Sequence, residues 1–172
     1  SRLFLLDQLQ ISPLTEGLIG TKSIVITREQ CHFRCFDLSH LPKRARSAAL
    51  TIQAKQWAPY ADAGFMVAWR EARALVWAYD AKKIHQRIQQ HARPLQKCKL
   101  LPESALYPPI ADGVRLLQCK SGYEAQLWKA HDLVASRWWA SIPDEAAWQN
   151  FQRDSGVNIS EREPQTSVEV IS

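Results

Sequence analysis

Alternation of apolar and polar positions predicts most of the strands. Residues 74–78 are apolar throughout, which indicates a strand buried on both faces. Arg28 and Glu29 stand between the first two strand patterns and are expected to form a hairpin turn. The predicted strands are a hairpin at 23–27 and 30–38, a second hairpin at 64–70 and 73–79, a short strand at 99–101, and a meander at 114–120, 124–129 and 133–139.

Helical spacing follows each group of strands. Ser39 is expected to cap a helix that has Pro42 in its first turn and ends before Pro59. Asp80 is expected to cap a second helix over 81–93, which Pro94 stops. A third helix is predicted at 144–154 and closed by Gly156. These repeated hairpin–helix units predict an α/β fold with a mixed sheet flanked by helices.

The same pattern predicts the domain boundaries. Residues 1–22 are expected to form an arm or a short strand plus a loop, and residues 23–156 one α/β domain. Two small lobes, 23–103 and 104–156, are an alternative division of that domain. Residues 157–172 are predicted to be a polar tail that frays.

Composition fits a folded domain, because 46% of the 172 residues are hydrophobic and 23% are charged. No apolar run approaches the roughly 20 residues that span a bilayer, and the first ten residues do not show the pattern of a signal peptide. The net charge of +5 is unevenly placed, because the stretches 38–58 and 81–102 contain basic residues and no acidic ones. Such basic stretches attract anionic lipid, nucleic acid or acidic proteins.

The candidate interaction surface combines these basic helices with an aromatic pair. Adjacent strand residues point to opposite faces, so one tryptophan of the pair is expected to be exposed for docking. The candidate residues are Lys43, Arg44, Arg46, Lys82, Lys83, Arg87, Trp138 and Trp139.

The four cysteines are expected to be free, reduced and structural. Cys31 and Cys35 share one face of a predicted strand, roughly 13 Å apart. That separation is too long for two ligands of one zinc, whose bonds to sulfur are about 2.3 Å. Reduced thiols favour the cytoplasm.

No phosphate-binding glycine loop or nucleophile elbow occurs in the sequence, so we predict no catalytic residue, no cofactor and no metal. Two alternatives stay open. Asp37, Asp80 and Asp132 lie at predicted strand ends, which would suit a metal-dependent hydrolase or nuclease on a ribonuclease-H-like sheet. The basic helices would suit nucleic acid, although no helix-turn-helix, zinc-finger or RNA-recognition signature accompanies them.

Residues 23–154 resemble the cytoplasmic actin-like domain of the type II secretion system L proteins and the related type IV pilus PilM proteins. The resemblance lies in the order of the elements and in two motifs. These are a short strand that ends in Leu101-Pro102-Glu103 and a basic helix start, Leu41-Pro42-Lys43-Arg44-Ala45-Arg46-Ser47-Ala48-Ala49-Leu50. The phosphate loops of actin-like ATPases are missing, so the resemblance assigns no nucleotide-binding residue.

The resemblance implies a ribonuclease-H-like or actin-like lobe and a function without catalysis. It implies a scaffold on the cytoplasmic side of the bacterial inner membrane that docks an assembly ATPase and neighbouring secretion or pilus proteins. The basic helices would then suit an anionic membrane surface. Self-association into a homo-oligomer is compatible with this reading, and nucleic acid is not expected as a partner.

Overall fold

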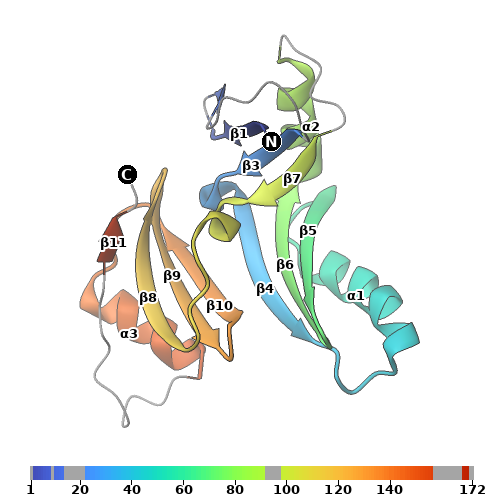
Figure 1. Cartoon of the computed structure of the whole chain (residues 1–172), viewed down its shortest axis with the longest axis vertical. Helices are drawn as coiled ribbons and strands as arrows, with labels where there is room; N and C mark the ends of the chain where they lie inside the picture. The colour runs from blue at the N-terminus through green and yellow to red at the C-terminus, as the bar shows by residue number, and fades with distance from the viewer. Residues whose placement is uncertain (1, 9, 14–21, 92–97, 157–167, 171–172) are drawn as a thin grey trace.

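A computed structural model describes residues 2–8, 10–13, 22–91, 98–156 and 168–170. In this part of the chain the strands form three sheets, and three α-helices pack on them. In Figure 1 the first sheet lies at the top, the second at the right with α1, and the third at the left with α3. The α/β class is confirmed, and the strands are distributed over three sheets.

The first sheet has the order β2-β1-β3-β7 and is mixed, as predicted. β3 is parallel to β1 and to β7, whereas β2 is antiparallel to β1. Ile24, Val25 and Ile26 of β3 are fully buried. The strands are β1 (Arg2–Leu6), β2 (Ile11–Pro13), β3 (Lys22–Ile26) and β7 (Lys99–Pro102).

The predicted first hairpin is wrong. After β3 the chain makes a short 3-10 helix, η1 (Arg28–Gln30), and enters the second sheet as β4 (Cys31–Asp37). β4 pairs with β6 (Arg73–Asp80) instead of β3. The reason is that β1 and β7 already occupy both hydrogen-bonding edges of β3.

The second sheet has the order β4-β6-β5. β5 (Ala63–Arg70) and β6 form the predicted hairpin, with Glu71 in the left-handed region at φ 51°. β6 is buried on both faces, as predicted. Its alternate residues Leu75, Trp77 and Tyr79 join one hydrophobic cluster, and Ala74 and Val76 join another.

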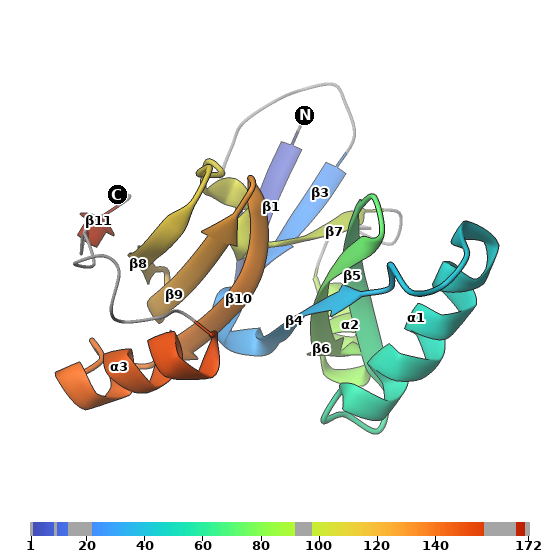
Figure 2. The same ribbon diagram turned by 90° about the horizontal axis from the view of Figure 1, so that it is seen from below.

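The two basic helices therefore lie on opposite faces of this sheet. α2 (Ala81–Gln89) packs Ile84 and Ile88 into the cluster that contains Trp77. α1 (Lys43–Trp57) packs Leu50 and Ala54 into the cluster that contains Val76. Both helices can be followed in Figure 2. Residues 92–97, including Pro94, lie outside the described residues.

The prediction that Ser39 caps α1 is wrong. Pro42 is the N-cap residue, in extended conformation and without a side-chain capping bond. The backbone N–H of Ser39 instead donates to Asp37 Oδ1 at 3.0 Å. A residue before proline is pushed toward extended conformation, so Leu41 is disfavoured in a helix and a helix capped by Ser39 does not form. The end of α1 at Trp57, two residues before Pro59, agrees with the prediction.

The cap of α2 is as predicted, because Asp80 Oδ1 accepts a hydrogen bond from the Lys83 N–H at 3.2 Å. Removing such a cap costs about 1 kcal/mol. We expect Asp80→Ala to lower the free energy of unfolding by that amount in urea titrations. Asp62→Ala, which removes an exposed carboxylate outside the cap, is the control and should change it by less than about 0.5 kcal/mol. Equal effects of the two substitutions would contradict the capping role.

The third sheet has the order β10-β9-β8-β11. The predicted meander consists of β8 (Gly113–Cys119), β9 (Gly122–Lys129) and β10 (Asp132–Trp139). β11 (Val168–Val170) is parallel to β8, so these residues of the predicted tail form a strand. α3 (Glu145–Asp154) is capped by Asp144 and packs Phe151 onto the sheet. Gly156 follows α3 at φ 74°.

The main hydrophobic cluster joins the three sheets. It contains Ile24 from the first sheet, Trp77 from the second, and Trp128 and Leu133 from the third. A second 3-10 helix, η2 (Glu103–Leu106), connects β7 to β8 beside it. None of the described helices combines the length and the apolar character that a membrane span requires.

Candidate functional site: a buried arginine network

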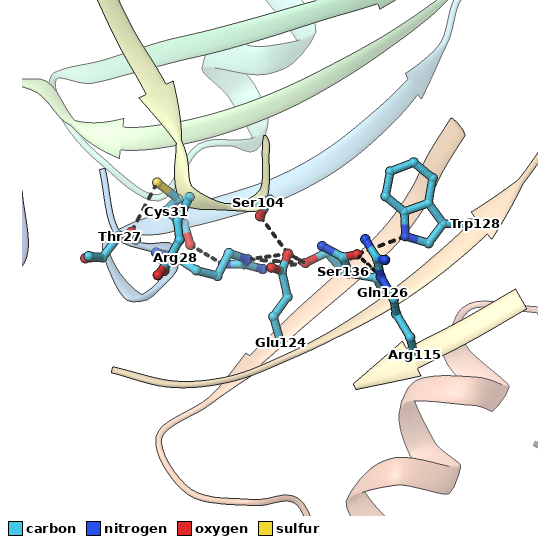
Figure 3. A network of polar contacts seen from close by, with 10 residues as sticks. Thr27, Arg28, Cys31, Ser104, Arg115, Glu124, Gln126, Trp128 and Ser136 are labelled. Carbon is cyan, nitrogen blue, oxygen red and sulfur yellow. Dashed lines mark hydrogen bonds and ion pairs between the residues drawn. The ribbon is translucent and has the colours of Figure 1, made fainter. Parts of the chain in front are cut away.

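Arg28 of η1 carries the most extensive polar network among the described side chains (Figure 3). Its side chain is 5% exposed and extends from the start of the second sheet to the third. Nε lies 3.2 Å from Glu124 Oε1 on β9, and Nη1 donates to the Cys31 carbonyl at 2.6 Å. Nε and Nη2 both lie within hydrogen-bonding distance of Ser136 Oγ on β10, at 3.2 and 3.1 Å.

Glu124 is the acceptor at the centre of this network. Its side chain is fully buried, and Oε1 accepts hydrogen bonds from Ser104 Oγ at 2.8 Å and Ser136 Oγ at 2.6 Å. A buried carboxylate is stable only when it is paired and hydrogen-bonded. Three donors from η1, η2 and β10 satisfy Oε1, whereas the buried Oε2 has no hydrogen-bond partner among the described residues. The three donors join segments that are far apart in the chain.

Glu103 makes a parallel connection through backbone groups. Oε1 accepts from the Arg28 N–H at 2.9 Å and Oε2 from the Lys120 N–H at 3.0 Å. Burial raises the pKa of this carboxyl above its ordinary value. The two backbone hydrogen bonds oppose that shift, and the nearby charge of Glu124 adds to it.

The raised pKa of Glu103 predicts how its contribution to stability depends on pH. A carboxyl whose pKa is higher in the folded state than in the unfolded state stabilises the fold at pH values below its ordinary pKa of about 4.5. That stability is lost as the pH rises through the raised folded value. We therefore compare the free energy of unfolding of the wild type with that of Glu103→Gln. We expect the wild type to exceed the variant by more near pH 4.5 than at neutral pH. A difference that is constant or grows with pH would contradict the burial of this carboxyl.

A second polar cluster extends the network along the same face of the third sheet. Gln126, which is fully buried, accepts hydrogen bonds at Oε1 from Arg115 Nε and Trp128 Nε1, both at 2.9 Å. The Arg115 guanidinium lies 5.3 Å from the centroid of the Trp128 ring. The face of the third sheet that points toward the other two sheets is thus held by directional polar contacts as well as by apolar packing.

The contacts of Ser136 do not match those of an activated nucleophile. Its hydroxyl donates to a carboxylate that Arg28 already holds, and His131 lies before β10, five residues away in the chain. Among the described residues no base is hydrogen-bonded to the Ser136 hydroxyl in the way that an activated nucleophile requires. The sequence analysis did not find these residues. The signal that was available is a charged residue, Glu124, at a sheet position whose neighbours are apolar.

The predicted basic residues differ in how accessible they are. Lys43, Arg44, Lys82 and Lys83 are exposed. Arg46 and Arg87 are half-buried and hydrogen-bonded within the chain, Arg46 Nε to the Leu41 carbonyl at 3.1 Å and Arg87 Nη1 to Gln30 Oε1 at 3.2 Å. Because α1 and α2 lie on opposite faces of the second sheet, the exposed charges form two separate groups.

The expectation of an exposed tryptophan at Trp138 or Trp139 is wrong, because both side chains are half-buried. The Trp139 ring packs edge-on against Phe151 of α3 at 6.1 Å. Trp138 packs against Gly122, where a Cβ would come within 2.7 Å of its Nε1. Both faces of β10 are covered at this position, so alternation does not expose either ring.

The three strand-end acids do not form one site, because Asp37 and Asp132 line one pocket with Arg70 and Arg73 whereas Asp80 lies apart from them. Asp37 pairs with Arg73 at the start of β6, whereas Asp80 ends that strand, roughly 23 Å away. Asp132 lies 3.6 Å from both Arg70 and Arg73. Among the described residues no three His, Cys, Asp or Glu side chains form a potential metal site.

The cysteines are free, as predicted. Cys31 and Cys35 lie on the same side of β4, against the main cluster, which agrees with the predicted shared face. Burial raises the pKa of the Cys31 thiol to about 12, and the nearby Arg28 charge opposes the shift. The thiol is therefore protonated at neutral pH.

Comparison with known structures identifies the fold. No family model matches the chain, and no curated protein matches it either. The structure is similar to the cytoplasmic domain of EpsL, an inner membrane component of the type II secretion system of Vibrio cholerae. The TM-score is 0.59 at 11% identity, and the match covers 99% of this chain and 84% of the other.

A second similar structure is a protein from Bacteroides thetaiotaomicron with an actin-like ATPase fold and unknown function. Its TM-score is 0.51 at 8% identity, over 91% of this chain and 77% of the other. The resemblance predicted for residues 23–154 is confirmed at the level of the fold, and the chain has the actin-like fold that it shares with the cytoplasmic domain of EpsL.

Proposed function

We propose that this chain is a non-catalytic scaffold domain of a bacterial secretion or pilus-type assembly system, on the cytoplasmic side of the inner membrane. It docks an assembly ATPase and neighbouring inner-membrane proteins of that system. The observation that carries the proposal is the fold shared with the EpsL domain over 99% of the chain.

The site geometry supports a role without catalysis. Arg28, Glu124 and Ser136, the groups that could have carried chemistry, are engaged with one another in the interior. Asp37, Asp80 and Asp132 are each engaged separately, by Ser39, by the cap of α2 and by two arginines. This arrangement disfavours the metal-dependent hydrolase as the alternative function.

The exposed basic residues are the proposed docking groups. Lys43 and Arg44 begin α1, and Lys82 and Lys83 begin α2 on the other face of the sheet. Two separate groups allow two different contacts, one with an acidic protein surface and one with an anionic membrane. Each exposed Lys or Arg near such a membrane adds about 1 kcal/mol of attraction.

A pull-down with the assembly ATPase of the same organism, at about 0.15 M salt, tests the proposal. The variants are Lys43→Glu with Arg44→Glu, and Lys82→Glu with Lys83→Glu. Lys120→Glu with Lys129→Glu is the control, because it reverses two exposed charges on the third sheet. We expect one of the two helix variants to lose about tenfold or more in affinity while the control is retained. Failure of the wild type to retain the ATPase, together with turnover of a substrate, would overturn the proposal.

A further inference from the structure

A large cavity lies beside the arginine network, and Ser104 of η2 belongs to both. Its volume is about 570 Å³, within the range of pockets that take one drug-sized molecule. The elements that line it are β5 and β6, β7 with η2, and the β9–β10 hairpin, which can be followed in Figure 1. The cavity is thus lined by elements of all three sheets and opens to solvent, and no function described above uses it.

The lining combines apolar walls with positive charge. The walls include Met66, Leu75, Trp128 and Leu133. Arg70 and Lys99 also line the cavity, whereas no Asp or Glu does among the described residues. Lys99 is exposed and makes no ion pair with a described residue, and Arg70 shares Asp132 with Arg73. An occupant with a negative charge is therefore favoured over a neutral or positive one.

Trp77 and Trp128 line the cavity with their indole rings. The Nε1 of Trp77 is buried among protein atoms without an acceptor among the described residues, and the Nε1 of Trp128 donates to Gln126. Both rings therefore add apolar area to the walls against which the chain of an occupant would lie.

We propose that the cavity binds a single-chain amphipathic carboxylate of the medium-chain fatty-acid kind. The chain lies against the apolar walls, and the exposed ammonium group of Lys99 is the partner of the carboxylate. The volume favours one free acyl chain over a phospholipid with two. This inference is independent of the proposed docking role, which uses the exposed starts of α1 and α2.

The proposal is tested by titrating the whole chain with octanoate, decanoate and dodecanoate below their micelle concentrations. Binding is measured by calorimetry and by tryptophan fluorescence. We expect saturation at one ligand per chain and an affinity that rises about fourfold with each added methylene. Decyltrimethylammonium, which has a chain one methylene longer than that of decanoate and the opposite charge, should bind at least about tenfold more weakly than decanoate. Equal binding of the two head groups would overturn the proposal.

Two matched pairs of variants locate the site. Ala68→Phe fills the cavity from β5 and should abolish saturable binding, whereas Ala48→Phe, exposed on α1, should leave it unchanged. Lys99→Gln should weaken decanoate about tenfold and leave decyl alcohol unchanged, whereas Lys82→Gln should affect neither. Binding that survives Ala68→Phe would show attachment to the outer surface and would overturn the assignment. Retained circular dichroism of each variant shows that the loss is not unfolding.

Discussion

Replacing Arg28 with methionine is expected to lower the free energy of unfolding by about 3–5 kcal/mol. The substitution keeps much of the apolar volume but leaves Glu124 buried without its positive partner. It also removes the donor to the Cys31 carbonyl and the contacts with Ser136. Because domains are stable by about 5–15 kcal/mol, this loss is a large fraction of the total. Urea unfolding followed by circular dichroism measures it.

The double variant Arg28→Met with Glu124→Met separates the charge effect from loss of packing. Replacing both partners of a buried pair by apolar residues is often neutral or stabilising, so the double variant should recover most of the loss. It also provides a folded reference if the single variant does not fold.

An exposed ion pair provides the control for this experiment. Arg137 Nη2 lies 3.2 Å from Asp154 Oδ2, with side chains that are 40% and 52% exposed. Arg137→Met should cost no more than about 1 kcal/mol, since exposed pairs contribute little. A loss below about 1 kcal/mol for Arg28→Met, or a double variant less stable than the single one, would contradict the role assigned to the network.

Truncation of Phe151 to alanine is expected to cost about 3–5 kcal/mol. The Phe151 side chain is 1% exposed and packs α3 onto the third sheet. The centroid of its ring lies 6.1 Å from that of Trp139 and 6.0 Å from that of Trp148. Its removal opens a cavity between α3 and the third sheet. A 10-residue helix is marginal without tertiary packing, so α3 itself should fray.

Hydrogen exchange distinguishes this local effect from general destabilisation. In Phe151→Ala the amides of α3 should exchange faster than those of β8 and β9. Gln149→Ala, at an exposed position of the same helix, should change the free energy of unfolding by less than about 0.5 kcal/mol. Unchanged protection of α3 in Phe151→Ala would show that the helix is held by other contacts.

Local patterns predicted the local structure correctly. The β5–β6 hairpin, the meander and the cap at Asp80 depend on residues close together in sequence. The burial of β6 on both faces followed from its unbroken apolar run. Ser39 failed as a cap although the signal was local, because the effect of Pro42 on the preceding residue outweighs the preference of serine for that position.

Non-local pairing and single buried charges could not be predicted. The sequence around β3 and β4 is compatible with a hairpin, and the competitors, β1 and β7, lie elsewhere in the chain. Arg28 and Glu124 are 96 residues apart, and each is one charge without a periodic pattern. Exposure of Trp138 and Trp139 depends on what covers each face of β10, which alternation does not specify.

The position of β3 between two parallel neighbours has a consequence for synthesis of the chain. β3 emerges from the ribosome before the second sheet, whereas β7 follows only after the whole second sheet has been made. At about 5–20 residues per second, that interval lasts several seconds. During this time the apolar strand formed by Ile24, Val25 and Ile26 has one edge without its partner, so this segment is the part of the nascent chain most in need of a chaperone.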